Sequence, residues 1–110
     1  MLLPMVGMAE IRAFNDRLVR DYHPLRVVLF GSYARGTATD DSDVDLLVVM
    51  PYGGKAADVA VDIRLKLRPP FPLDLVVRRP DQIRERIAMG DSFLREVVAS
   101  GTILYEAVDR

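Results

Sequence analysis

Two aspartates, Asp43 and Asp45, lie at the start of an otherwise apolar run that ends at Val49. Aspartate is uncommon in strands, and a buried carboxylate is costly unless a cation or strong hydrogen-bond donors offset its charge. Side chains alternate along a strand, so these two carboxylates point to the same face, with Cα atoms about 7 Å apart. Such a pair can bind divalent cations. Considered alone, however, the two aspartates could simply be exposed to solvent at the start of the strand.

A glycine and a serine, Gly31 and Ser32, directly follow another apolar run. Glycine lets the backbone approach a phosphate closely, and the free N–H groups at the start of a helix attract anions. A further carboxylate, Asp74, lies alone inside a third apolar run. Considered separately, the first two residues could form an ordinary turn capped by Ser32, and Asp74 could protect an edge strand from aggregation.

The hydrophobic pattern predicts the elements that position these residues. Apolar side chains at spacings of three and four residues predict helices, which cover residues of about 8–22, 55–68, 80–90 and 92–100. Short apolar runs predict strands, at residues 26–30, 43–49 and 73–77, with a short fourth one at 103–105. We therefore expect an α/β (α+β) fold in which helices flank a small mixed sheet of about three to four strands.

Two details of this arrangement can be tested. Strands that are apolar at nearly every residue are usually covered on both faces of the sheet. The last helix is expected to be capped by Asp91 or Ser92 and to end at Gly101. Its inward side is expected to consist of Phe93, Leu94, Val97 and Val98.

Length and composition bound the class of protein. A chain of 110 residues has room for one domain, which we expect to cover residues 1–110. The net charge of −1 argues against a chain dominated by a nucleic-acid-binding surface, so no direct nucleic-acid contact is expected. The lack of cysteine excludes disulfides and fits a cytoplasmic protein. No apolar run approaches the ~20 residues that span a bilayer, and residues 1–9 lack the basic start of a signal peptide, so no membrane association is expected.

The motifs resemble the signature of the polymerase-β-type nucleotidyltransferase superfamily. That signature combines a Gly-Ser pair, a short spacer and an Asp-x-Asp motif, which here are similar to Gly31-Ser-Tyr-Ala-Arg-Gly36 and Ser42-Asp-Val-Asp-Leu-Leu47. Asp74 resembles the third carboxylate, on a neighbouring strand. The Ala-Arg-Gly extension is typical of the minimal nucleotidyltransferase family, and the resemblance covers residues of about 8–105.

The resemblance implies an enzyme that transfers AMP from ATP to an acceptor with the help of two Mg²⁺ ions. It implies that Asp43 and Asp45 bind both ions. Asp74 would bind the ion nearer the acceptor and help to take its proton.

The resemblance also implies that Gly31 and Ser32 hold the phosphates of the nucleotide. Arg35 falls within the motif and could reach a phosphate. As an alternative, Arg35 could be a surface residue that pairs with Asp40 or Asp41.

The motifs describe the nucleotide site, whereas the acceptor has to be inferred from the family. Larger members of the superfamily add a helical domain that holds base and acceptor, so we expect another chain to complete this site in a homo- or hetero-oligomer. In the minimal family a frequent partner is a helical toxin of the HEPN class, commonly an RNase, which implies an antitoxin that adenylylates a tyrosine of that toxin. Two alternatives stay open: nucleotidylation of a small molecule such as an aminoglycoside, and a non-catalytic module that neutralises a partner by contact alone.

Overall fold

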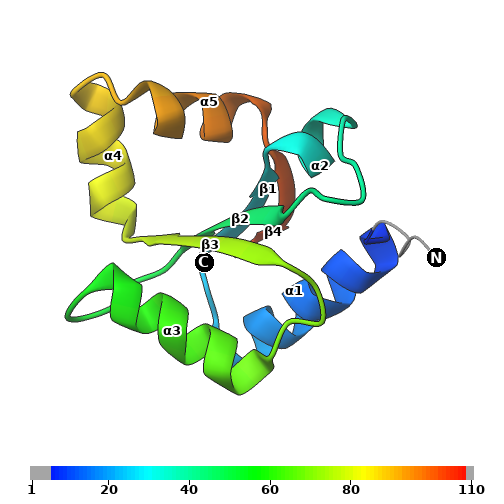
Figure 1. Cartoon of the computed structure of the whole chain (residues 1–110). Coiled ribbons are helices and arrows are strands. Elements are labelled where there is room, and N and C mark those ends of the chain that lie inside the picture. Colours follow the sequence, from blue (N-terminus) through cyan, green and yellow to red (C-terminus); the bar gives the residue numbers. More distant parts are fainter. Residues whose placement is uncertain (1–5, 109–110) are drawn as a thin grey trace.

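The computed structural model of the protein describes residues 6–108 (Figure 1). Its elements follow in the order α1 (Met8–Tyr22), β1 (Arg26–Phe30), α2 (Ser32–Arg35), β2 (Val44–Val49), α3 (Ala56–Leu67), β3 (Leu73–Arg78), α4 (Pro80–Ala88), α5 (Ser92–Ser100) and β4 (Thr102–Glu106). All the predicted helices and strands are present, with small shifts at their ends. The expectation that residues 1–9 form no signal peptide concerns mainly residues outside the described range. Among residues 6–108, no helix is long and apolar enough to cross a membrane.

The strands form one mixed sheet in the order β3-β2-β1-β4. β1 runs antiparallel to both β2 and β4, whereas β2 and β3 are parallel. Parallel neighbours cannot be joined by a tight turn, so the chain crosses from β2 to β3 through α3. The predicted α/β fold with a small mixed sheet is confirmed.

Helices cover both faces of this sheet, as its apolar strands predict (Figure 1). On one face, Phe14 of α1 and Ile63 of α3 are fully buried with Leu46 of β2. On the other face, Leu47 of β2 packs with Leu94 of α5, and α4 lies alongside. Successive side chains of β2 therefore enter opposite halves of the core, which explains why this strand is apolar at nearly every position.

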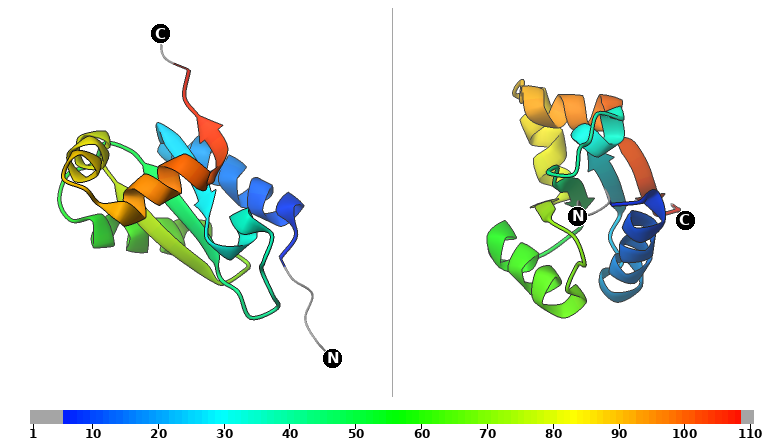
Figure 2. Two further views of the ribbon diagram at one scale, coloured as in Figure 1. Left: turned by 90° about the horizontal axis from the view of Figure 1, so that it is seen from above. Right: turned by 45° about the vertical axis from the view of Figure 1, so that its right-hand side comes forward.

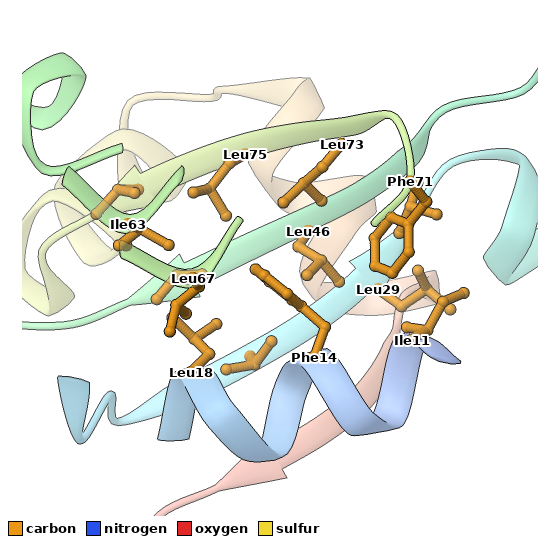
Figure 3. Packing of buried hydrophobic residues seen from close by; sticks show 14 residues of the cluster. Ile11, Phe14, Leu18, Leu29, Leu46, Ile63, Leu67, Phe71, Leu73 and Leu75 are labelled. Carbon is orange, nitrogen blue, oxygen red and sulfur yellow. The ribbon is translucent and has the colours of Figure 1, made fainter. Parts of the chain in front are cut away.

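The larger half of the core lies between the sheet and the pair α1 and α3 (Figure 3). Phe14 meets Phe71, which lies in the connector before β3, edge to face with ring centroids 5.7 Å apart. Such aromatic pairs contribute about 0.5–1.5 kcal/mol beyond the area that they bury. The contact holds the connector against α1 and so helps to fix the start of β3, where Asp74 lies.

The ends of α5 are held by two local features. Asp91 accepts a hydrogen bond from the N–H of Leu94 at 3.0 Å and caps the helix, and this bond lowers the pKa of the Asp91 carboxyl. At the other end, a Cβ atom on Gly101 would lie 2.5 Å from Cγ1 of Val28. Glycine thus allows the end of α5 to approach β1 closely, and the predicted cap and end of this helix are confirmed.

The prediction that Phe93 and Val98 face inward is wrong. Their exposed fractions are 47% and 37%, whereas Leu94 and Val97 are buried against the sheet. A helix buries one stripe of its surface, and with Leu94 and Val97 on that stripe, positions 93 and 98 fall on its flanks. The ring of Phe93 is therefore partly exposed to solvent on the flank of α5.

Candidate active site

Gly31 turns the chain from the end of β1 into α2. Its backbone has φ 73° and ψ −153°, a combination essentially restricted to glycine. A Cβ atom at this position would overlap the carboxylate of Asp45, whose Cγ atom would lie only 3.0 Å from it. Glycine is therefore required for two separate reasons, the backbone conformation and the approach of Asp45.

The strand register brings Asp45 and Asp74 side by side. Asp45 lies opposite Phe30 of β1 and opposite Asp74 of β3. Neighbouring strands are about 4.8 Å apart, and paired residues share a face of the sheet. Leu46 points into the half of the core that α1 and α3 cover, so both carboxylates lie on the face of α4 and α5. Asp45 also lies next to Gly31, where β1 ends.

Asp43 completes a group of three carboxylates. It immediately precedes β2 and is exposed, as is Asp74, whereas Asp45 is partly buried. Burial raises the pKa of the Asp45 carboxyl, and the negative charges of Asp74 and Asp43 raise it further. Asp43 and Asp74 are thus both close enough to Asp45 to raise its pKa, although the three carboxylates come from different segments.

The carboxylates provide the ligand chemistry of a magnesium site. Oxygen ligands are those that Mg²⁺ prefers, and a divalent cation would relieve the repulsion that acts on Asp45. Within residues 6–108, no three acidic, histidine or cysteine side chains already stand in the geometry of a metal site. Magnesium that is shared with a nucleotide usually takes only one or two carboxylates together with phosphate oxygens. Asp43, Asp45 and Asp74 fit that pattern if they are shared between two ions, so that each ion takes one or two of them.

Ser32 is the first residue of the short helix α2. Gly31, not Ser32, is the N-cap, and no side-chain capping bond is formed, so the interpretation of Ser32 as a helix cap is wrong. The first N–H groups of a helix have no partner within it. The start of α2 therefore presents backbone donors and a serine hydroxyl next to the carboxylates.

Arg35 ends α2 and is exposed. Its positive charge opposes the rise in the pKa of Asp45, which places the guanidinium near that carboxylate. Across the described residues 6–108, none of the salt bridges includes Arg35, so the alternative pairing with Asp40 or Asp41 is not formed.

A cavity of about 230 Å³ adjoins these residues. Gly31 and Arg35 lie in its wall on the side of α2, and Phe93 and Glu96 lie in its wall on the side of α5. The sequence motifs mark neither of the α5 residues. An aromatic side chain on a helix is ordinarily assigned to the core, and only the packing of α5 shows that Phe93 lies on its flank.

The family model of the nucleotidyltransferase domain matches residues 10–105. The chain belongs to this family. The resemblance to nucleotidyltransferases is thereby confirmed, and the protein is an enzyme of the class that transfers nucleotidyl groups.

Known proteins resemble this nucleotidyltransferase over most of its length. A Methanocaldococcus jannaschii protein assigned to the protein adenylyltransferases is 34% identical over 82 residues, which cover 73% of this chain and 77% of that protein. A Sulfolobus solfataricus crystal structure described as a nucleotidyltransferase has a TM-score of 0.63 at 19% identity, covering 90% of this chain and 79% of that one. A crystal structure of a toxin–antitoxin with AMP-PNP has a TM-score of 0.58 at 25% identity, covering 87% and 73%. The Sulfolobus structure supports the fold alone.

Proposed function

We propose that this nucleotidyltransferase is a Mg²⁺-dependent adenylyltransferase that transfers AMP from ATP to a protein. The proposal rests on the surroundings of Asp45, which pairs with Asp74 across parallel strands, responds to the charge of Asp43 and lies against Gly31. Oxygen ligands for cations thus lie beside a glycine turn that a phosphate can approach. Residues 1–110 then act as a single catalytic domain, in the cytoplasm, where ATP is abundant.

The acceptor that we propose is a HEPN-class toxin, modified at a tyrosine hydroxyl. A similar protein is assigned to the protein adenylyltransferases, and a similar structure is a toxin–antitoxin with AMP-PNP. Both favour a protein acceptor over a small molecule such as an aminoglycoside. The enzyme then acts as the antitoxin and silences its partner by covalent modification.

Phosphate binding is assigned to the turn between β1 and α2. The backbone at Gly31 lies close to the phosphates because no side chain intervenes. The Ser32 hydroxyl donates a hydrogen bond to a phosphate oxygen, and Arg35 adds a positive charge. Together they orient the triphosphate so that its α-phosphorus faces the carboxylates.

Transfer is assigned to the three aspartates. Asp43 and Asp45 would hold two Mg²⁺ ions, which would supply charge stabilisation for the transfer. The acceptor oxygen forms a bond to the α-phosphorus while the bond from that phosphorus to the bridging oxygen of the β-phosphate breaks. Pyrophosphate leaves, and the proton of the acceptor hydroxyl passes to the carboxylate of Asp74.

Incubation with ATP, Mg²⁺ and a purified HEPN-class toxin tests the proposed function. Intact mass spectrometry should show a gain of one adenylyl group on the toxin, with an equal amount of pyrophosphate released. EDTA, or phenylalanine in place of the modified tyrosine, should abolish the gain. Transfer to an aminoglycoside with none to the toxin would contradict the protein acceptor.

Asp74→Ala is expected to slow transfer about 10²- to 10⁴-fold, the usual contribution of a general base, while most of the nucleotide binding remains. The reason is that Asp74 acts on the acceptor side, whereas Asp43 and Asp45 bind the metal ions that the nucleotide shares. Isothermal titration with AMP-PNP and Mg²⁺ measures the binding. An affinity as low as that of an Asp43→Asn variant would show that Asp74 is an equal metal ligand instead.

Ser32→Ala is expected to lower kcat/KM less than any of the aspartate variants does. One hydrogen bond to a charged group is worth about 1.5–3 kcal/mol, or roughly 10- to 150-fold. The backbone donors of the turn remain in this variant. Thr37→Ala, in the exposed loop after α2, is the matched control and should retain the wild-type rate. Equal rates for both variants would show that Ser32 belongs to an ordinary turn.

A further inference from the structure

The cavity between α2 and α5 lies directly beside the proposed phosphate site. Figure 2 shows α2 next to α5 in both views. Gly31, which lies against Asp45, also lines the cavity, together with Arg35. A ligand whose phosphates lie at this turn therefore has an adjoining space for another part of the molecule.

The cavity has aromatic walls that remain open to a ligand. Phe30 and Phe93 meet edge to face, with ring centroids 5.5 Å apart. Phe93 is 47% exposed, so part of its ring is not covered by protein. An exposed aromatic ring beside a phosphate site is a suitable platform for stacking a nucleobase.

The volume of the cavity limits what it can hold. At about 230 Å³ it lies below the roughly 300–1,000 Å³ of pockets that enclose a whole drug-sized ligand. It suits a single flat ring system rather than a complete nucleotide. The triphosphate would then remain outside the cavity, at the open edge of the sheet.

The α2 and α5 walls of the cavity carry opposite charges. Arg35 contributes a positive charge near Asp45, whereas Glu96 of α5 contributes a carboxylate. Glu96 is exposed, and its carboxylate forms no salt bridge within the described segment 6–108. A nucleotide has the complementary polarity, because its phosphates are anionic and its base carries N–H donors.

The position of this carboxylate is well defined by the fold. The cap at Asp91 and the close approach of Gly101 to β1 hold α5 at both ends. The buried side chains of Leu94 and Val97 set the rotation of the helix and leave Glu96 at the cavity. Side chains on a helix fixed in this way are more accurately placed than side chains on a loop.

We propose that the cavity between α2 and α5 binds the adenine base of ATP, which stacks on Phe93 and donates a hydrogen bond from its 6-amino group to Glu96. The inference rests on the proposed function, because it assumes that the triphosphate lies at Gly31 and Ser32. It assigns recognition of the base to α5 of the catalytic domain itself. No second domain is then needed to hold the base.

Titration in the presence of Mg²⁺ uses two probes, ATP and inorganic tripolyphosphate. Comparing them separates the contribution of the base to binding from that of the phosphates. Phe93→Ala should weaken the binding of ATP about 5- to 150-fold, the usual contribution of one stacked base, and leave the binding of tripolyphosphate unchanged. Val98→Ala, an exposed apolar residue on the same helix, is the control and should bind both probes as the wild type does. Wild-type affinity of Phe93→Ala for ATP would overturn the proposal.

A second pair of probes tests the hydrogen bond. Purine riboside triphosphate differs from ATP only in lacking the 6-amino group. Glu96→Ala should weaken the binding of ATP roughly 10- to 150-fold, as for a hydrogen bond to a charged group, and hardly change that of the purine analogue. Equal losses for both ligands would overturn the role of Glu96.

Failure of the base site is distinguishable from failure of the phosphate site, on which the proposed function rests, and transfer of AMP to the toxin is measured separately by mass spectrometry. If tripolyphosphate does not bind, but ATP binds and depends on Phe93, the phosphate site is wrong and the base site stands. If tripolyphosphate binds as tightly as ATP in every variant, the phosphate site stands and the base site is wrong.

Discussion

Asp45→Asn is expected to slow AMP transfer by at least about 10²- to 10³-fold, the cost of removing one preorganised group that stabilises transition-state charge. Asp45 is the central carboxylate of the three, because it lies opposite Asp74 in the sheet and the charges of both Asp74 and Asp43 raise its pKa. Replacing it with a neutral amide removes a charged ligand of the proposed metal ions while conserving its size. Transfer of labelled AMP under single-turnover conditions is the measurement. Asp41→Asn, in the exposed loop before β2, is the matched control and should retain transfer.

The same variant should stabilise the metal-free protein. Burial and neighbouring charges raise the pKa of Asp45 above its ordinary value of 3.8, so the folded protein takes up this proton more readily than the unfolded chain does. The wild type should therefore lose stability as the pH rises from 3.8 through the raised pKa. Thermal melts in EDTA across this range should show a smaller loss for Asp45→Asn, and Mg²⁺ should raise the Tm of the wild type more than that of the variant. An apo Tm at neutral pH that is lower for the variant would contradict this account.

Gly31→Ala is expected to remove most of the transfer activity and to destabilise the fold. The backbone conformation at Gly31 costs a residue with a Cβ atom about 1–3 kcal/mol, and that atom would overlap the carboxylate of Asp45. Either the turn or the carboxylate has to move, and both belong to the proposed site. The rate of transfer and the Tm should therefore fall together.

Gly36→Ala separates the two causes. Gly36 also has a positive φ, 76°, but a Cβ atom there would meet no atom within 4 Å. This variant should lower the Tm by an amount that corresponds to about 1–2 kcal/mol and should retain most of the activity. Similar activities for the two glycine variants would show that contact with Asp45 is not the reason for glycine at position 31.

Local sequence patterns were sufficient for the elements of this fold. The spacing of apolar residues predicted the four longer helices and the strands closely, because these patterns reflect which side of an element faces the core. Asp91 and Gly101 marked the ends of α5 because caps depend on hydrogen bonds and backbone conformations a few residues long. The spacing of Asp43 and Asp45 also predicted that they share a face of one strand, since side chains alternate along a strand. Asp43 in fact immediately precedes β2, and its charge still affects Asp45.

Sequence patterns could not rank the carboxylates. Asp43 and Asp45 were predicted as equivalent ligands, yet only Asp45 is partly buried and lies opposite Asp74. That difference depends on the register between β2 and β3, which pairs Asp45 with Asp74 and is set by tertiary packing. The reason for glycine at position 31 is equally nonlocal, because the carboxylate that a Cβ atom would meet comes from the neighbouring strand.

The amino-acid sequence by itself determined the family signature, the secondary structure and the strands that carry the aspartates, because each depends on residue types and short spacings. The tertiary structure alone decided that Phe93 lies on the flank of α5 and that Glu96 lines a cavity shared with Gly31. α2 and α5 are far apart in the chain, but both pack against β1 and line the same cavity. The rotation of α5 about its axis follows from which of its apolar side chains fit best against the sheet. That outcome depends on the shapes of the contacting surfaces, which hydrophobic spacing does not specify.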